Sequence, residues 1–166
     1  MRRVFSALLL LFIVAAALPA QEQSDILRSF QKSFVRGNLN TKIQVLQDAA
    51  TRNDVDMGPL YHQALDFIID NANIFENDLV ARELGILAVR LIGISGHNEA
   101  LSSLWEYFTV DNTTSVRIEV LNAIGNLTPV DTRLVNNLNR WLDGQNDRLR
   151  AGEEVDLDVI EEAVVA

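Results

Sequence analysis

The sequence predicts an all-α protein. Three observations support this fold class: apolar residues recur at helical spacing in short blocks, turn residues separate the blocks, and no period-two run is long enough for a strand. With 166 residues, 48% of them hydrophobic and 22% charged, the chain has the length and composition of one folded domain. The sequence therefore has room for a sizeable helical core.

The first 20 residues have the pattern of a secretory signal peptide. Two arginines precede an apolar run over residues 7–18, and Leu18-Pro19-Ala20 supplies a small-residue cleavage site. The run is short for a membrane-spanning helix, and an uncleaved anchor is the alternative. The expected organisation is a signal peptide over residues 1–20 and a helical domain over residues 21–166, with no stable membrane anchor after cleavage. The short signal and its Ala-rich boundary are typical of bacteria, so we expect export to the periplasm or cell envelope.

The chain is acidic and contains no cysteine. Its formal charge is −9, and the loss of Arg2 and Arg3 with the signal, two positive charges, would make it −11. Such a balance repels phosphate backbones and anionic lipid, so nucleic acid is not an expected partner. Because there is no cysteine, neither disulfides nor thiolate metal sites can form, and apolar packing must hold the fold.

Capping and helix-breaking residues place the expected helices. Asp78 and Asp156 are expected N-caps, Thr128 is expected to cap a helix that begins at Pro129, and Gly96 is expected to end a helix. Residues 143–154 are polar and form either a frayed extension or a loop. The expected helices run from Ser24 to Gly37, Asn40 to Arg52, Pro59 to Asn71, Leu79 to Ile94, His97 or Asn98 through Phe108, Val116 to Leu127, Thr128 through Leu142, and Leu157 to Ala166.

The fourth of these helices is apolar nearly all round, from Leu84 to Ile92. A helix of this kind is surrounded by other helices, so we expect it at the centre of the fold. The aromatic residues of the neighbouring helices fall at core spacing, and we expect them to pack in the core rather than to stack on a ligand. These aromatic residues are Trp105, Tyr107, Phe108 and Trp141.

The helix from Val116 to Leu127 resembles the second helix of a HEAT repeat. The family pattern has an acid in the preceding turn, then Val-Arg, a small residue, a larger aliphatic residue and Gly. The matching residues are Asp111, Val116, Arg117, Val120, Ile124 and Gly125, with Val120 larger than the usual Ala. The resemblance implies an α-α superhelix, a HEAT/armadillo-like α-solenoid of about three and a half helix pairs. An irregular helical bundle is the alternative.

The second helices of the expected helix pairs can be aligned by distance from their N-caps, and this alignment gives a repeat register. It pairs Thr41-Lys42, Ala81-Arg82, Val116-Arg117 and Val159-Ile160, at spacings of the HEAT type. A rival register pairs Leu84 with Val116 but loses the arginine. In the preferred register an acid precedes the arginine by six residues twice, which predicts turn ion pairs between Glu76 and Arg82 and between Asp111 and Arg117.

The resemblance also implies that the second helices line a concave, protein-binding surface. Its expected members are acidic and amide-rich with one arginine, which suits a basic or polar protein segment. These candidate partner-binding residues are Gln44, Gln47, Asp48, Glu83, Arg90, Glu119, Asn122 and Asn126. The resulting hypothesis is a non-catalytic interaction scaffold of the cell envelope.

No motif for catalysis, a metal or a cofactor is expected to be functional. His62 and Asp66 are one helical turn apart, but at most two ligands converge there, so a surface hydrogen bond is the preferred interpretation. Residues 93–97 lack the strand and spacing of a nucleophile turn. The alternatives are a HEAT-like lyase-type enzyme or its accessory subunit, which would need a clustered acid/base set, and a purely structural envelope component.

The last helix forms half of an apolar stripe, from Val159 to Ala166, with no polar capping unit after it. An exposed apolar stripe of this kind is unfavourable in water. We therefore expect either further repeats or a second subunit at this end.

Overall fold

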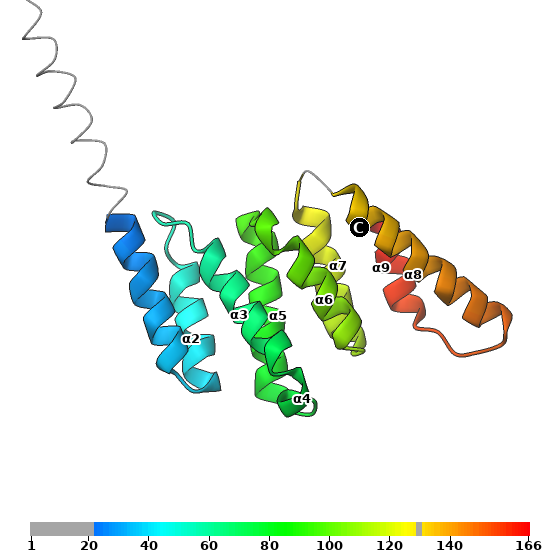
Figure 1. Cartoon of the computed structure of the whole chain (residues 1–166), viewed down its shortest axis with the longest axis horizontal. Coiled ribbons are helices and arrows are strands. Elements are labelled where there is room, and N and C mark those ends of the chain that lie inside the picture. The colour runs from blue at the N-terminus through cyan, green and yellow to red at the C-terminus, as the bar shows by residue number, and fades with distance from the viewer. Residues whose placement is uncertain (1–21, 129–130) are drawn as a thin grey trace, which may run out of the picture.

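The computed structural model describes residues 22–128 and 131–166. Within these residues every regular element is a helix, and no strand is present, as the sequence predicts (Figure 1). The expected signal peptide lies outside the described residues. No helix in residues 22–128 or 131–166 is long and apolar enough to cross a membrane.

The chain runs through the helices in a simple order. A first helix covers residues 22–36. The other elements are α2 (Leu39–Ala50), α3 (Gly58–Asp70), α4 (Ala72–Phe75), α5 (Leu79–Ser95), the 3-10 turn η1 (Asn98–Ala100), α6 (Leu101–Val110), α7 (Thr114–Asn126), α8 (Thr132–Arg150) and α9 (Leu157–Val165).

The helices pack in a row. Helix α2 contacts α5, α5 contacts α7, and α7 contacts α9, so these four alternate helices form one continuous layer. Helix α3 packs against α5 and α6, while α6 packs against α7 and α8 against α9. Figure 1 shows the row extending from the helix of residues 22–36 at one end to α8 and α9 at the other.

Local hydrogen bonds explain where several helices begin and end. The side chain of Asp78 accepts from the backbone N–H groups of Val80 and Ala81, which begins α5, and Asp156 caps α9 in the same way. Gly96 ends α5 with a φ of +67°, a left-handed conformation that suits glycine. These three sequence predictions are confirmed.

Helix α5 lies at the centre of the core, as its composition predicts. Leu84, Ala88, Val89 and Ile92 are all fully buried, and α5 packs against α2, α3 and α7. Because three helices surround it, no large apolar side chain between Leu84 and Ile92 is exposed, whereas Leu79 and Ile94 near the ends of α5 are 73% and 74% exposed.

The aromatic side chains also pack as predicted. Tyr107 and Phe108 are buried, and Trp105 and Trp141 are partly buried against the core. The Phe108 ring stacks on Trp105 and meets Trp141 edge-on.

Several expected helix boundaries are wrong. Helix α8 begins at Thr132, and its N-cap is Asp131, whose side chain accepts from the N–H of Arg133. Thr128 is therefore not its cap, and Pro129 lies outside the described residues. Helix α8 continues to Arg150, so most of the polar stretch after residue 142 extends the helix.

The sequence does not predict the short helix α4, and it predicts one helix from His97 or Asn98 where the structure has the separate turn η1 followed by α6. Helix α4 and the turn η1 each contain fewer residues than a hydrophobic period needs to be recognised.

Candidate functional site

The eight candidate partner-binding residues lie on α2, α5 and α7, three helices that are neighbours in the row. We call them the second-helix face. Glu119 is half-buried and the other seven are exposed, so all eight side chains reach the surface. The structure therefore presents them to solvent, and it joins some of them to one another.

Arg90 of α5 and Glu119 of α7 form a bidentate ion pair across the contact between the two helices. Arg90 Nε donates to Glu119 Oε1 over 3.0 Å, and Arg90 Nη2 donates to Oε2 over 2.8 Å. The hydrogen bond and the charge of Glu119 raise the pKa of Arg90. Because Arg90 lies on α5 and Glu119 on α7, their ion pair joins the two helices as well as adding polar groups to the second-helix face.

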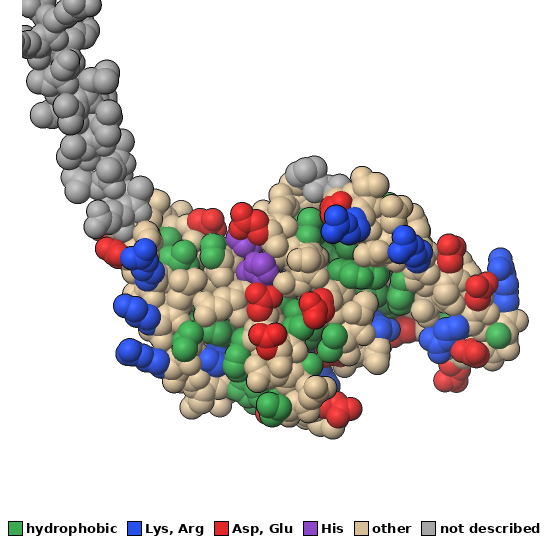
Figure 2. All heavy atoms as spheres, viewed as in Figure 1, with side chains coloured by type: hydrophobic (Ala, Val, Ile, Leu, Met, Phe, Trp, Pro, Cys, Tyr) green, Lys and Arg blue, Asp and Glu red, His purple; other side chains and the backbone are tan. Residues whose placement is uncertain are grey.

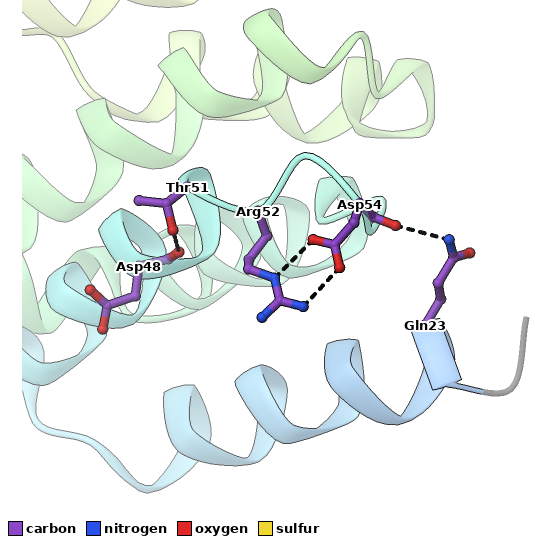
Figure 3. Close-up of polar contacts among 5 residues, drawn as sticks. All are labelled: Gln23, Asp48, Thr51, Arg52 and Asp54. Atoms are coloured by element: carbon purple, nitrogen blue, oxygen red, sulfur yellow. Dashed lines mark hydrogen bonds and ion pairs between the residues drawn. The ribbon is translucent and has the colours of Figure 1, made fainter. Parts of the chain in front are cut away.

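The other members of the face make short-range bonds or none. Gln44 Nε2 donates to Asp48 Oδ1 over 2.8 Å, one turn along α2. Asn126 Nδ2 donates to the carbonyl of Asn122 over 3.0 Å. Figure 3 shows the carboxylate of Asp48 directed away from the neighbouring polar cluster, while its backbone carbonyl accepts from the Thr51 hydroxyl.

That neighbouring cluster joins the first helix to the loop after α2. Arg52 makes two hydrogen bonds to the carboxylate of Asp54, at 2.9 and 2.8 Å, and Gln23 Nε2 donates to the Asp54 carbonyl over 2.8 Å (Figure 3). The hydrogen bond from Arg52 lowers the pKa of Asp54, and the same bond raises the pKa of Arg52. The cluster ties residues 31 positions apart and thereby supports one end of α2.

The two predicted turn ion pairs do not form. No ion pair joins Glu76 to Arg82 or Asp111 to Arg117, although the structure describes all four residues. Arg117 does fold back toward the turn, but its Nε donates to the backbone carbonyls of Phe108 and Asp111, at 3.1 and 3.2 Å.

The reason lies in the geometry of the turn. The Asp111 carboxylate accepts from the N–H of Thr113 over 2.8 Å, which leaves the unpaired carbonyls at the end of α6 for Arg117. Burial lowers the pKa of Arg117, and the charge of Asp111 opposes this effect. The arginine therefore acts as a C-terminal cap for the preceding helix.

Lys42 makes the same kind of contact at the equivalent position. Its ammonium donates to the carbonyls of Phe34 and Val35 at the end of the first helix, and it lies 4.3 and 4.6 Å from the ring centroids of Phe34 and Phe67. Burial lowers the pKa of Lys42. Thr41-Lys42 stands where the other second helix has Val116-Arg117, and although the residues differ, Lys42 and Arg117 both donate to carbonyls at the end of the preceding helix.

Arg82, the third basic residue in this register, lines a cleft. The cleft has a volume of about 570 Å³ and lies between α3 and α4 on one side and the turn from α6 to α7 on the other. Glu76, Tyr107 and Asp111 also line it. Arg82 Nε and the Tyr107 hydroxyl are buried without a hydrogen-bond partner among the described residues.

The protein's two histidines meet in a cluster that the sequence did not predict. The rings of His62 and His97 lie 5.6 Å apart, and Figure 2 shows the histidines together on the surface. Ser103 Oγ lies 2.9 Å from His62 Nε2 and donates to Asp66 Oδ1 over 2.8 Å. The predicted direct hydrogen bond between His62 and Asp66 does not form, because the two side chains are 3.6 Å apart and Ser103 bridges them.

The order of groups in this cluster differs from that of a catalytic triad. In a triad, the histidine stands between the serine and the acid and takes the serine proton. Here the serine stands between, and because its single proton goes to Asp66, its oxygen can only accept from His62. The arrangement joins α3 to α6, and His62 is not placed to take the proton of Ser103.

No group of three or more His, Asp or Glu side chains in the described part of the chain is placed to hold a metal ion. Comparison with protein-family models, with curated proteins and with solved structures found no match.

Proposed function

We propose that the chain is a HEAT-like α-solenoid that serves as a non-catalytic protein-binding scaffold. One observation carries the solenoid proposal: Lys42, Arg82, Arg117 and Ile160 are each the fourth residue of their helix, and those helices are the four that pack in sequence as one layer. Stacked helix pairs require that their second helices share one residue register and pack as a continuous layer. The matching backbone contacts of Lys42 and Arg117 give the register a physical basis.

The second-helix face is the proposed binding surface. Asp48 and Glu83 are exposed and carry charges that no ion pair in the described residues neutralises. Around them stand amides that can both donate and accept hydrogen bonds. A basic or polar protein segment fits this chemistry, and a rigid helical surface binds it with little ordering of its own side.

The scaffold is proposed to act in the bacterial cell envelope after export. The signal-peptide pattern of residues 1–20 supports this location. The order of the groups around Ser103 is not that of a serine hydrolase, and the exposed acidic and amide-rich side chains of the second-helix face are the reason that a scaffold is preferred to a lyase-type enzyme.

The binding face can be tested by charge reversal. We expect Asp48→Lys with Glu83→Lys to abolish capture of a specific partner in a cross-linked pull-down from envelope extract. Asp70→Lys with Glu106→Lys is the matched control, because it changes the net charge equally at exposed acids on α3 and α6. An identical partner list for the wild type and the face variant would contradict the proposed surface, provided that circular dichroism shows both folded.

The solenoid proposal has a separate test. Small-angle X-ray scattering should give the profile of an elongated particle, and a profile of a compact sphere would contradict it.

A further inference from the structure

Two segments at opposite ends of the row of helices differ in the sign of their charge. From Ile26 to Gln47 the sequence contains four basic residues and no acidic one, whereas residues 151–166 contain six acidic residues and no basic one. In a chain with a net charge of −9, the first segment is a marked local excess of positive charge. Each of these two segments therefore attracts charges of the sign that the other segment presents.

The basic end is a shallow groove on the helix of residues 22–36. Arg28, Lys32 and Arg36 recur every four residues, so they lie along one side of the helix. They line the groove together with Val35, which is 65% exposed. Lys32 and Arg36 have no ion-pair partner within the described residues, and Arg28 has only a long contact of 3.9 Å to Asp25.

The acidic end is the face of α9 that points away from α7. Val159 and Ala163 are buried where α9 meets the rest of the protein. On the opposite side, Asp158 and Glu161 are exposed and lie beside large apolar side chains that are also exposed. These apolar side chains are Leu157, Val164 and Val165, which are 64%, 73% and 77% exposed.

We propose that the acidic outer face of α9 in one copy of this chain docks into the basic groove of residues 28–36 in a second copy. Both surfaces combine exposed valine with charged neighbours, and the charges are complementary. An apolar centre with a charged rim is the usual composition of a specific interface. The contact joins two different faces, so it is heterologous and continues from copy to copy as a head-to-tail chain.

This contact uses neither α2, α5 nor α7 and leaves the second-helix face open. It stands independently of the proposed scaffold function, and failure of either proposal leaves the other intact. The attraction acts between solvent-exposed charges, which salt screens. The association between copies should therefore weaken as the salt concentration rises.

The test is sedimentation equilibrium of the full chain in a density-matched nonionic detergent. We expect the average mass to rise with protein concentration at about 20 mM salt and to fall back toward the monomer at about 0.5 M salt. Variant N carries Arg28→Glu and Lys32→Glu, and variant C carries Asp158→Lys and Glu161→Lys. Each variant alone presents like charges at both ends, so its association should be at least about tenfold weaker than that of the wild type.

An equimolar mixture of variants N and C is the decisive measurement. Each junction in the mixture again joins opposite charges, so association should return to the wild-type level. Arg133→Glu with Arg140→Glu, at exposed positions on α8, is the matched control for variant N and should associate like the wild type. A wild type that stays monomeric at low salt, or variants that associate as strongly as the wild type, would overturn the proposal.

Discussion

Gly93 of α5 and Ala123 of α7 lie in such close contact that a Cβ atom on Gly93 would stand 2.9 Å from Ala123 Cα. Glycine in a helix interior normally lowers stability by about 0.5 to 1 kcal/mol relative to alanine. At position 93 glycine should instead give the more stable protein, because alanine would force the backbones of α5 and α7 apart. We expect Gly93→Ala to lower the free energy of unfolding by about 1 to 3 kcal/mol, measured by urea denaturation.

Gly144→Ala is the matched control for that substitution. Gly144 lies within α8, and a Cβ atom there would meet no other atom within 4 Å. Alanine should therefore stabilise the protein by about 0.5 to 1 kcal/mol. If the two substitutions had the same sign, the close approach of α5 and α7 would not be present in solution.

The Arg90–Glu119 pair should contribute a small and salt-dependent coupling energy. Its side chains are 53% and 23% exposed, so water screens much of the attraction. A double-mutant cycle of Arg90→Ala and Glu119→Ala should give a coupling of about 0.5 kcal/mol at low salt. The coupling should decrease at high salt, and additivity of the two substitutions at low salt would show that the pair does not form.

Tyr107→Phe should change how the free energy of unfolding depends on pH in alkaline solution. Burial, with a contribution from Asp111, raises the pKa of Tyr107 above its ordinary value of 10.0, while Arg82 opposes the shift. A raised folded-state pKa means that the stability is fully present below pH 10.0 and is lost as the unfolded tyrosine ionises at higher pH. The variant should therefore lose less stability than the wild type when urea denaturation is compared at pH values below and above 10.0.

The same variant has a second readout at pH 7. The Tyr107 hydroxyl is buried without a partner in the described residues, so its removal should increase stability by about 1 kcal/mol. A loss of stability would mean that the hydroxyl is hydrogen-bonded in solution.

Lys42→Ala should be strongly destabilising, although lysine substitutions are usually mild. Lys42 is 5% exposed, and its ammonium joins α2 to the end of the first helix. Loss of its packing and hydrogen bonds should lower the free energy of unfolding by about 2 kcal/mol. Lys32→Ala, on the exposed side of the first helix, should change it by less than about 0.5 kcal/mol. Equal effects of the two substitutions would contradict the buried position of Lys42.

Most of the helices could be predicted because their signals are local. Asp78 and Gly96 bound α5 through contacts with residues a few positions away, and such contacts can be read from sequence. The beginning of α8 was harder, because Thr128 and Asp131 are both good capping residues within one turn. The extension of α8 to Arg150 has little apolar periodicity, and the side-chain contacts of Arg148 with Glu153 and the Glu154 carbonyl hold its end.

The contacts of the candidate site were less predictable because they depend on how separate helices align. Arg90 and Glu119 were each expected at the surface, but their pairing joins residues 29 positions apart. The bridge that Ser103 makes to Asp66 spans 37 residues. No local pattern marks Ser103, and only the relative rotation of α3 and α6 brings it between His62 and Asp66. The prediction that Arg117 folds back to the turn is confirmed, but its Nε donates to backbone carbonyls, and the Asp111 carboxylate accepts from the N–H of Thr113.

The arrangement of the helices in a row has a consequence for how the protein folds. Its principal contacts join helices that follow one another closely along the chain, so few long loops must close before packing begins. We therefore expect rapid folding, and we expect α5 to form early because it contacts helices on both sides. Local opening should start at the two outermost helices, where amide hydrogens exchange soonest, and reach α5 last.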